Sequence, residues 1–329
     1  MKKIIILIFL IASSCLWSQD SYKPYESWIS AGNIFMTITS EGRAQSKVVL
    51  TKFIASDLYY YGVPAIRQDG IIWSGIVKDG TAPRLRAGGN FVNRGTQPGS
   101  ILTRGMAENP QSQKVNHVWC AIKDYYEFQI DREYAIRYNK AVEDVTDEEI
   151  FNRKVIFKDD YRDWPESKGA PPRSQTGYYS VDYAAQLAWF VYNDYDSAKT
   201  MAATGSPPIG LEIQETIWAY DYRSIATRCF IVRQVRMFYK GTADTPDSAR
   251  IDSMYVGLWA DFESGAPQND LLAYDSDLEM AYVYNDGGTD AEYEQLGFLP
   301  SVFGCAFLKG PLVPEPYAQP QLGMRTVNG

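Results

Sequence analysis

The chain has 329 residues, of which 45% are hydrophobic and 14% aromatic, and its formal net charge is −8 with a pI of about 4.9. This hydrophobic content can fill a packed core, and the length predicts one large domain or two ordinary ones. An acidic chain without a basic tract argues against nucleic acid or an anionic membrane surface as a partner.

The first residues have the order of an export signal. Two lysines precede an apolar run over residues 4–12, and small residues follow it. This order is typical of a secretory signal peptide, and the run is far shorter than the roughly 20 residues that span a bilayer. We predict a signal peptide over residues 1–18, cleaved after Ser18, and no transmembrane segment. Lipid attachment at Cys15, which would give an outer-membrane lipoprotein, is the alternative.

Alternation of apolar and polar residues is the dominant pattern of the remaining chain, and it predicts β-strands. The segments Leu211–Ala219, Val235–Tyr239 and Asp252–Phe262 each place apolar side chains on one face. Strands of this kind pack one face on a core and leave the other face wetter. We predict an all-β fold of antiparallel, sandwich-like sheets with little helix.

Turn and cap residues divide these strands. Gln68–Gly70 is predicted to form a tight hairpin turn, since Asp-Gly favours a positive φ, and Lys78–Gly80 is predicted to end the next strand. One helix is predicted over residues 147–156, with Thr146 as its N-cap and Glu149 completing a capping box. This helix is expected to be a short surface connection.

Prolines and glycines cluster between residues 163 and 178. Proline lacks the amide donor that a β-ladder needs, so this segment is predicted to be a linker. We therefore expect two abutting units: an N-terminal β-rich unit over residues 19–162 and a second sandwich-like unit over residues 179–329.

Three cysteines follow the predicted signal: Cys120, Cys229 and Cys305. A small exported domain stapled by disulfides would have more cysteines, in an even number. Because each lies among apolar residues, we expect buried thiols, and one disulfide with a thiol left over is the alternative.

His117 is the only histidine, which excludes a zinc site made of several histidines. The sequence has no GxSxG nucleophile elbow to partner it, no P-loop and no GxGxxG motif. We expect His117 to be structural and expect no nucleotide chemistry.

Oxygen donors crowd the segment that follows the strand ending near Ala260. Carboxylates and an amide at close spacing, with a glycine that lets the loop turn, suit the six to eight oxygen ligands of Ca²⁺. The predicted ligands are Asp261, Glu263, Asn269, Asp270, Asp275 and Asp277. The other interpretation is that Asp, Asn and Gly simply favour turns. Turn formation is the preferred interpretation for two similar clusters, at residues 193–196 and 285–290.

Glycoside hydrolysis is a further alternative, because it needs two carboxylates at a set separation, and aromatic rings can stack on sugars. The available carboxylates are Glu212, Glu215, Asp221, Asp261 and Glu263. Trp218 and Trp259 are candidate stacking residues, although tryptophans in strands more often fill cores.

Several long segments resemble the N-terminal region of large secreted bacterial proteins that end in a type IX secretion sorting domain. They are residues 71–80, 84–102, 163–172, 187–197, 205–220 and 251–286. The resemblance implies a β-rich protein of the cell surface and no established activity. The chain departs from it at residues 173–177, where relatives carry an acidic loop, and at Glu263, where they often have Asp. The chain reaches Gly329 without a sorting domain, so export by this route is inferred from the resemblance alone, and whether the chain is a fragment of a longer protein stays open.

We therefore expect a secreted or cell-surface module for attachment, adhesion or display, without catalysis and stabilised by calcium. Its expected partner is an extracellular polymer, either glycan or protein. The alternative is a carbohydrate-active protein that binds or hydrolyses glycans. An exposed aromatic platform beside two convergent carboxylates would favour the alternative, and aromatics buried in the core would favour the first function.

Overall fold

The computed structural model describes residues 23–31, 33–54, 57–91, 95–122, 127–172, 184–220 and 230–310. Strands make up 45% and helices 21% of the structure, and the strand pairings are antiparallel. The predicted all-β, antiparallel fold is confirmed.

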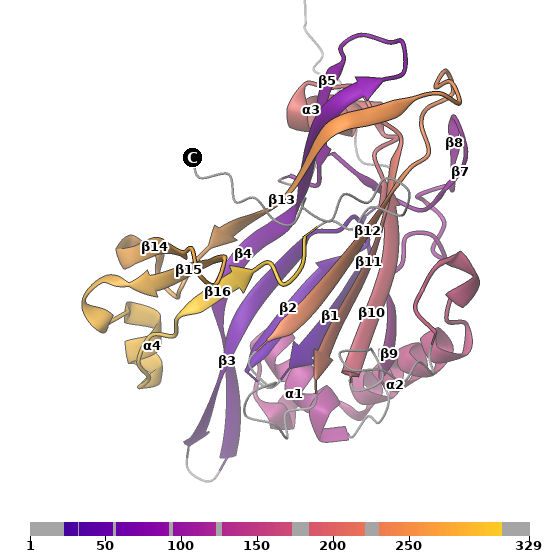
Figure 1. The fold of residues 1–329 in the computed structure, drawn as a ribbon. Helices are drawn as coiled ribbons and strands as arrows, with labels where there is room; N and C mark the ends of the chain where they lie inside the picture. Colours follow the sequence, from indigo (N-terminus) through magenta and orange to yellow (C-terminus); the bar gives the residue numbers. More distant parts are fainter. Residues whose placement is uncertain are drawn as a thin grey trace, which may run out of the picture.

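Two large sheets form the body of the molecule (Figure 1). The first sheet has the order β1-β2-β3-β4-β13, and β5 also pairs with β4. Its strands are β1 (Glu26–Ala31), β2 (Ile34–Thr39), β3 (Ala44–Ile54), β4 (Asp57–Lys78), β5 (Leu85–Gly89) and β13 (Arg250–Phe262).

The second sheet has the order β12-β11-β10-β6, and β9 also pairs with β10. Its strands are β6 (Gln97–Pro98), β9 (Trp119–Ile122), β10 (Ala184–Asn193), β11 (Leu211–Tyr220) and β12 (Ile231–Tyr239). Two smaller sheets do not pair with the large ones: β7 (Ile101–Thr103) with β8 (Met106–Ala107), and the three-stranded β14 (Asp270–Asp275), β15 (Met280–Asn285) and β16 (Phe303–Ala306).

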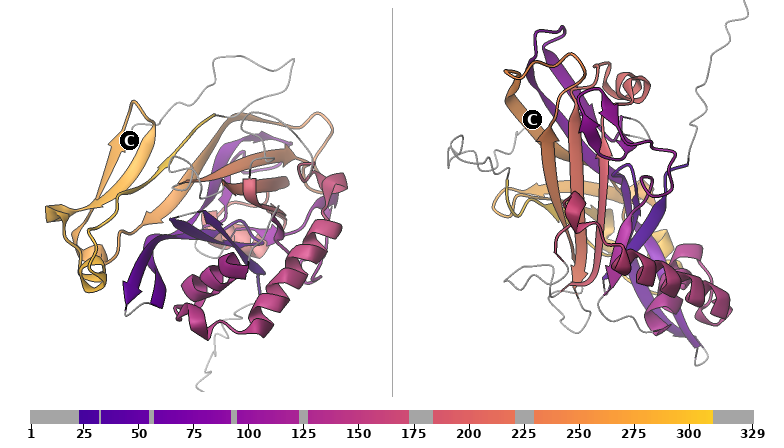
Figure 2. Two further views of the ribbon diagram at one scale, coloured as in Figure 1. Left: turned by 90° about the horizontal axis from the view of Figure 1, so that it is seen from below. Right: turned by 90° about the vertical axis from the view of Figure 1, so that its right-hand side faces the viewer.

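Four α-helices lie in the described part of the chain: α1 (Glu127–Tyr138), α2 (Asp147–Arg162), α3 (Ser197–Thr204) and α4 (Ala291–Leu296). Short 3₁₀ turns lie at η1 (Val142–Asp144), η2 (Glu166–Lys168), η4 (Pro267–Asn269) and η5 (Asp286–Gly288). Helices α1 and α2 cover one side of the body, and the three-stranded sheet projects from another (Figure 2). No helix in the described residues is both long and apolar enough to cross a membrane.

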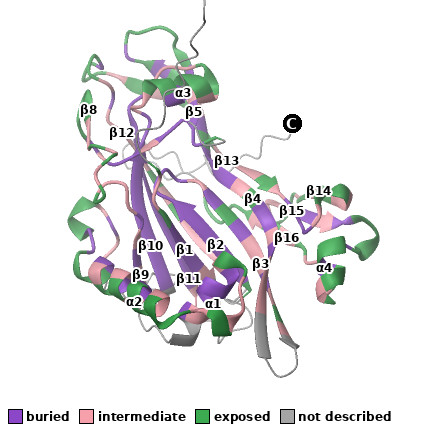
Figure 3. Cartoon of the chain, turned by 180° about the vertical axis from the view of Figure 1, so that it is seen from behind, coloured by how far each residue is buried: buried purple, intermediate pink, exposed green. Residues whose placement is uncertain are grey.

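The main core lies between the two large sheets. Phe35 and Ile38 of the first sheet and Phe190 and Ile213 of the second belong to one buried cluster, each at most 1% exposed. A second cluster lies on the outer face of the second sheet, where Trp164 covers Trp189 and Trp218. Both faces of β10 and β11 are therefore covered, and β10 is among the most deeply buried strands in Figure 3. The expectation of a wet face on residues 211–219 is wrong, because every residue of that segment is buried.

A half-buried arginine links the two large sheets. Arg233 on β12 contacts Asp69 of β4 at 2.5 Å and Glu215 of β11 at 2.8 Å. The hydroxyl of Tyr192 donates to the second oxygen of Glu215 at 2.5 Å. Burial lowers the pKa of Arg233, but the two carboxylates raise it by more, so the side chain stays charged. The network supplies a specific polar contact between the two sheets.

The predicted hairpin at Gln68–Gly70 is wrong, because β4 runs through it without interruption. Asp69 is 2% exposed and its carboxylate is needed by Arg233. Gly70 is needed for close packing, since a Cβ there would lie 2.7 Å from the carbonyl oxygen of Asn90. The second turn signal is confirmed: β4 ends at Lys78, and Gly80 has a φ of +86°.

Helix α2 begins as predicted, with Thr146 as its N-cap and Glu149 completing the capping box. It is longer than predicted, extending to Arg162, and it is not a mere surface connection. Its buried Arg153 lies over the rings of Trp28 at 4.0 Å and Phe157 at 4.2 Å. Sequence analysis missed helix α1.

The predicted linker at residues 163–178 does not coincide with a division between sheets. Strand β13 follows it and pairs with β4, while β6 and β9 precede it and pair with β10. Both large sheets thus combine strands from the two predicted units. Cys120 is a buried free thiol and Cys305 a half-buried one. Cys229 and residues 173–178 lie outside the described residues.

Candidate functional site

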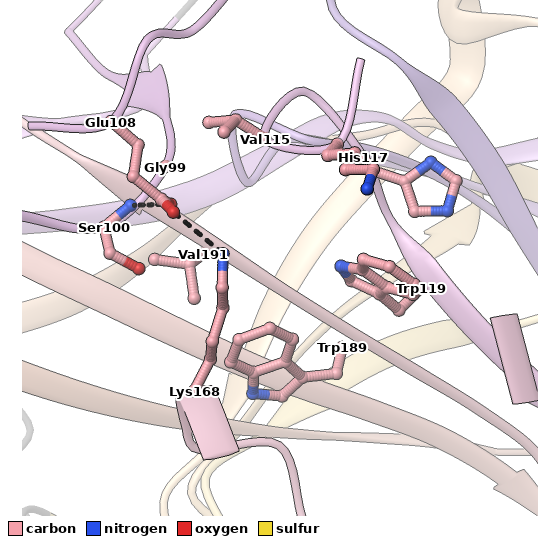
Figure 4. A pocket seen from close by; sticks show the side chains of 10 residues that line it. Gly99, Ser100, Glu108, Val115, His117, Trp119, Lys168, Trp189 and Val191 are labelled. Atoms are coloured by element: carbon pink, nitrogen blue, oxygen red, sulfur yellow. Dashed lines mark hydrogen bonds and ion pairs between the residues drawn. The ribbon is translucent and has the colours of Figure 1, made fainter. Parts of the chain in front are cut away.

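A small hollow lies on the outer face of the second sheet, where several chain segments converge (Figure 4). Its volume is about 20 Å³, enough for one water-sized group but not for a sugar ring. The segments come from the loops around β7 and β8, from β9 and β10, and from η2. The lining residues are Gly99, Ser100, Glu108, Lys114, Val115, His117, Trp119, Lys168, Trp189 and Val191.

Two tryptophans form one wall of the hollow. Trp119 of β9 pairs directly with Trp189 of β10, so both side chains lie on the same face of the sheet. Trp189 is 2% exposed, and its indole N–H has no hydrogen-bond acceptor among the described residues. Trp119 is half-buried, and its indole nitrogen lies on the side of the ring that faces Lys168. The wall therefore offers an aromatic surface and, at Trp119, an N–H donor.

An ion pair closes the opposite side. Lys168 Nζ lies 2.8 Å from Glu108, whose other oxygen accepts from the Ser100 backbone N–H at 3.0 Å. Burial raises the pKa of Glu108, but these hydrogen bonds lower it by more, so its pKa lies below the usual range. Glu108 is thus held as a carboxylate.

His117 is fixed behind the wall by contacts on three sides. Its Nε2 lies 2.8 Å from the buried carboxylate of Asp160 on α2, whose second oxygen accepts from the Cys120 backbone N–H at 2.8 Å. Its ring lies 4.5 Å from the ring of Tyr25 and 4.8 Å, edge to face, from that of Trp119. These contacts hold the edge of Trp119 in place, which gives His117 a structural task at the rim of the hollow. Burial raises the pKa of the Cys120 thiol to about 12, so it is not a nucleophile at neutral pH.

The lining of the hollow can be compared with what glycoside hydrolysis and sugar binding each require. Glycoside hydrolysis needs a general acid with a raised pKa and a second carboxylate. Among the described residues that line the hollow, Glu108 is the one carboxylate, and Lys168 keeps it ionised. Aromatic faces and N–H donors, by contrast, suit the apolar faces and the oxygens of a sugar.

The six predicted calcium ligands do not meet at one point. Asp270 begins β14 and Asp275 ends it, which places them about 17 Å apart at the usual rise of a strand. Two ligands of one Ca²⁺ ion must lie within about 5 Å of each other. Asp275 instead accepts from the backbone N–H groups of Asp277 and Leu278 at the tip of the hairpin. Because the strand separates Asp270 from Asp275, the six residues cannot bind one calcium ion together.

The remaining predicted ligands have other partners. Glu263 is 4% exposed and pairs with Arg67, and Asp261 is exposed on β13. Asp270 accepts from Ser264 N at 3.0 Å, and the amide of Asn269 donates to a backbone carbonyl. No group of three or more His, Cys, Asp or Glu side chains in the described residues is arranged to hold a metal ion.

The two other acidic clusters contain residues that organise the backbone. Asp194 accepts from the backbone N–H groups of Ile209, Gly210 and Leu211, and burial raises its pKa to about 6. Asp290 caps α4 and also accepts from Ala266 N at 2.9 Å. These contacts fit the interpretation that the clusters form turns.

The carboxylates considered for hydrolysis are also engaged. Glu212 is buried and bound by Lys240 at 2.6 Å, and Glu215 is bound by Arg233. Trp218 is 8% exposed, and Trp259 is half-buried, with its indole N–H donating to the Asn90 carbonyl at 3.1 Å. Neither ring forms an exposed platform. Asp221 lies outside the described residues.

Comparison of the chain with protein-family models, with curated proteins and with solved structures finds no match. The site must therefore be interpreted from its own geometry. Sequence analysis missed its lining residues, because Trp119 read as an ordinary strand residue and Lys168 lay in the predicted linker. The one available signal was that Trp119 lies two positions after the only histidine, His117.

Proposed function

We propose that the chain is a non-catalytic module of the cell surface or extracellular space that attaches to a glycan through the hollow around Trp119. The observation that carries this proposal is the pairing of Trp119 with Trp189 beside an ion-paired carboxylate. A sugar ring would stack on the partly exposed indole of Trp119, outside the hollow. One substituent of the ring would enter the hollow and accept hydrogen bonds there.

The absence of catalysis is supported by the state of the carboxylates. Glu108 is paired with Lys168, and Glu212 and Glu215 are buried and paired with cations. Burial also raises the pKa of Glu133, but this side chain is 1% exposed and accepts from Trp28 and Gln186. The other described carboxylates with a raised pKa, Asp194, Asp270 and Glu292, do not line the hollow.

The location outside the cell is supported by the signal-like residues 1–18. Mass spectrometry of the mature protein's N-terminus tests it. Loss of residues 1–18 is expected, whereas a diacylated Cys15 would replace secretion by lipid attachment. An intact Met1 in the mature protein would contradict export.

The binding site is tested by Trp119→Ala on a panel of immobilised polysaccharides. Removal of a central aromatic contact typically costs at least about 2 kcal/mol, which corresponds to a roughly 30-fold weaker affinity. Trp119→Phe keeps an aromatic face and should retain part of the binding, which separates stacking from a folding defect. Tyr255→Ala is the matched control, because Tyr255 is a 62% exposed aromatic residue on the other large sheet. Equal binding by Trp119→Ala and wild type would refute the proposed site.

A further inference from the structure

The hollow carries more positive than negative charge, although the whole chain is acidic. Lys114, Lys168 and the single carboxylate Glu108 line it, and Lys168 and Glu108 neutralise each other at 2.8 Å. Lys114 is exposed, and its charge lowers the pKa of Asp163, which also pairs with Arg162 at 2.8 Å. The lining of the hollow thus holds two lysines and one carboxylate, on a chain whose net charge is −8.

The hydrogen-bonding groups of the hollow have the same bias. Lysine ammonium and indole groups are donors only. The indole N–H of Trp189, in a side chain that is 98% buried, has no acceptor among the described residues. Glu108, the one charged acceptor, is occupied by Lys168 and by the Ser100 backbone N–H. A ligand that brought acceptor oxygens would satisfy the lysine donors, and charged oxygens do so most strongly.

We infer that the ligand of the hollow is an acidic glycan, whose carboxylate or sulfate group is held by Lys114 and Lys168 while its ring stacks on Trp119. This inference rests on the proposed function. The volume of about 20 Å³ suits this arrangement, because it admits the oxygen of a substituent but not a ring. Charged oxygens make stronger hydrogen bonds to lysine than a neutral hydroxyl does.

The test compares polysaccharides that differ only in charge, by titration calorimetry in calcium-free buffer. Polygalacturonate is compared with its methyl ester, and dextran sulfate with dextran, so that the two pairs distinguish carboxylate from sulfate. One pair is expected to show at least tenfold tighter binding of its charged member. Raising sodium chloride from 0.05 to 0.5 M should remove most of that difference, because salt screens exposed charges.

The site of the effect is tested by Lys114→Gln, which should weaken binding of the charged polymer about fivefold, the value of one charge contact near water. Lys78→Gln is the matched control, since it removes the same charge from the other large sheet, where Lys78 is 42% exposed. Equal losses in both variants would show a general field effect and refute the inference. Equal binding of charged and neutral polymers would refute it as well, and would leave the proposed function standing. Failure of every polymer to bind would refute the proposed function and the inference together.

Discussion

Replacing Arg233 by methionine is expected to cause a large loss of stability, because one guanidinium serves two buried carboxylates. Asp69 and Glu215 are 2% and 0% exposed, and both contact Arg233 within 2.8 Å. Removing one partner of a buried ion pair typically costs about 3–5 kcal/mol, since the other charge stays buried without a partner. Because Arg233→Met leaves two buried carboxylates without a partner, the loss of stability should lie at the upper end of this range.

Urea unfolding measures the effect as a lower midpoint at an unchanged slope. The triple variant Arg233→Met, Asp69→Asn, Glu215→Gln should recover part of the loss, because it removes the stranded charges. Arg162→Met is the matched control: Arg162 is 63% exposed and also pairs with two carboxylates, so its midpoint should not move measurably. A loss below about 1 kcal/mol for Arg233→Met, or no recovery in the triple variant, would refute the reasoning.

Three further predictions concern Asp79, Gly70 and calcium binding. Burial raises the pKa of Asp79, but the hydrogen bonds of Arg86 and of a backbone N–H lower it by more, so the net shift is downward. The stability from ionised Asp79 is therefore complete above its ordinary pKa of about 3.9 and is lost as the pH falls through the lower folded value. Asp79→Asn should lower the free energy of unfolding by about 3–5 kcal/mol at pH 7, measured by urea unfolding. If the difference between wild type and variant does not shrink in acid, this explanation is contradicted. Gly70→Ala should cost about 1–3 kcal/mol, because the added methyl group meets Asn90, and a neutral effect would contradict the packing role of this glycine. Calcium binding at residues 261–277 stays a prediction. At a calcium concentration 100 times the dissociation constant, the ion would add about 2.7 kcal/mol to the free energy of unfolding, and Asp270→Asn would reduce this gain. Identical melting curves with calcium and with chelator would end that hypothesis.

The parts of the fold that local chemistry determines could be predicted. Strands β11, β12 and β13 could be predicted from alternating side chains, because the residues of each strand alone determine which of its faces is apolar. The start of α2 follows from Thr146 and Glu149, because a capping box involves residues three positions apart.

The errors arose where a distant residue decides the structure. Asp69-Gly70 has the chemistry of a turn, but Arg233, 164 positions away, takes the carboxylate, and Asn90 takes the space beside the glycine. The six predicted calcium ligands do not meet at one point for a related reason. Close spacing in sequence does not mean closeness in space once Asp270 and Asp275 occupy opposite ends of a strand.

The hollow could not be found from the sequence, because its parts come from segments up to 92 positions apart, between Gly99 and Val191. Only the antiparallel pairing of β9 with β10 brings Trp119 beside Trp189. Lys168 reaches the hollow through a short 3₁₀ turn inside the predicted linker.

The central claim is attachment to a glycan without its hydrolysis, and one experiment measures both on the same sample. The protein is incubated with its best-bound polysaccharide, and depletion of protein from solution and release of reducing ends are followed together. Wild-type protein is expected to be depleted with no reducing ends released above a protein-free blank, and Trp119→Ala is expected to stay in solution. Release of reducing ends that disappears in Glu108→Gln would contradict the claim and make the hollow a catalytic site.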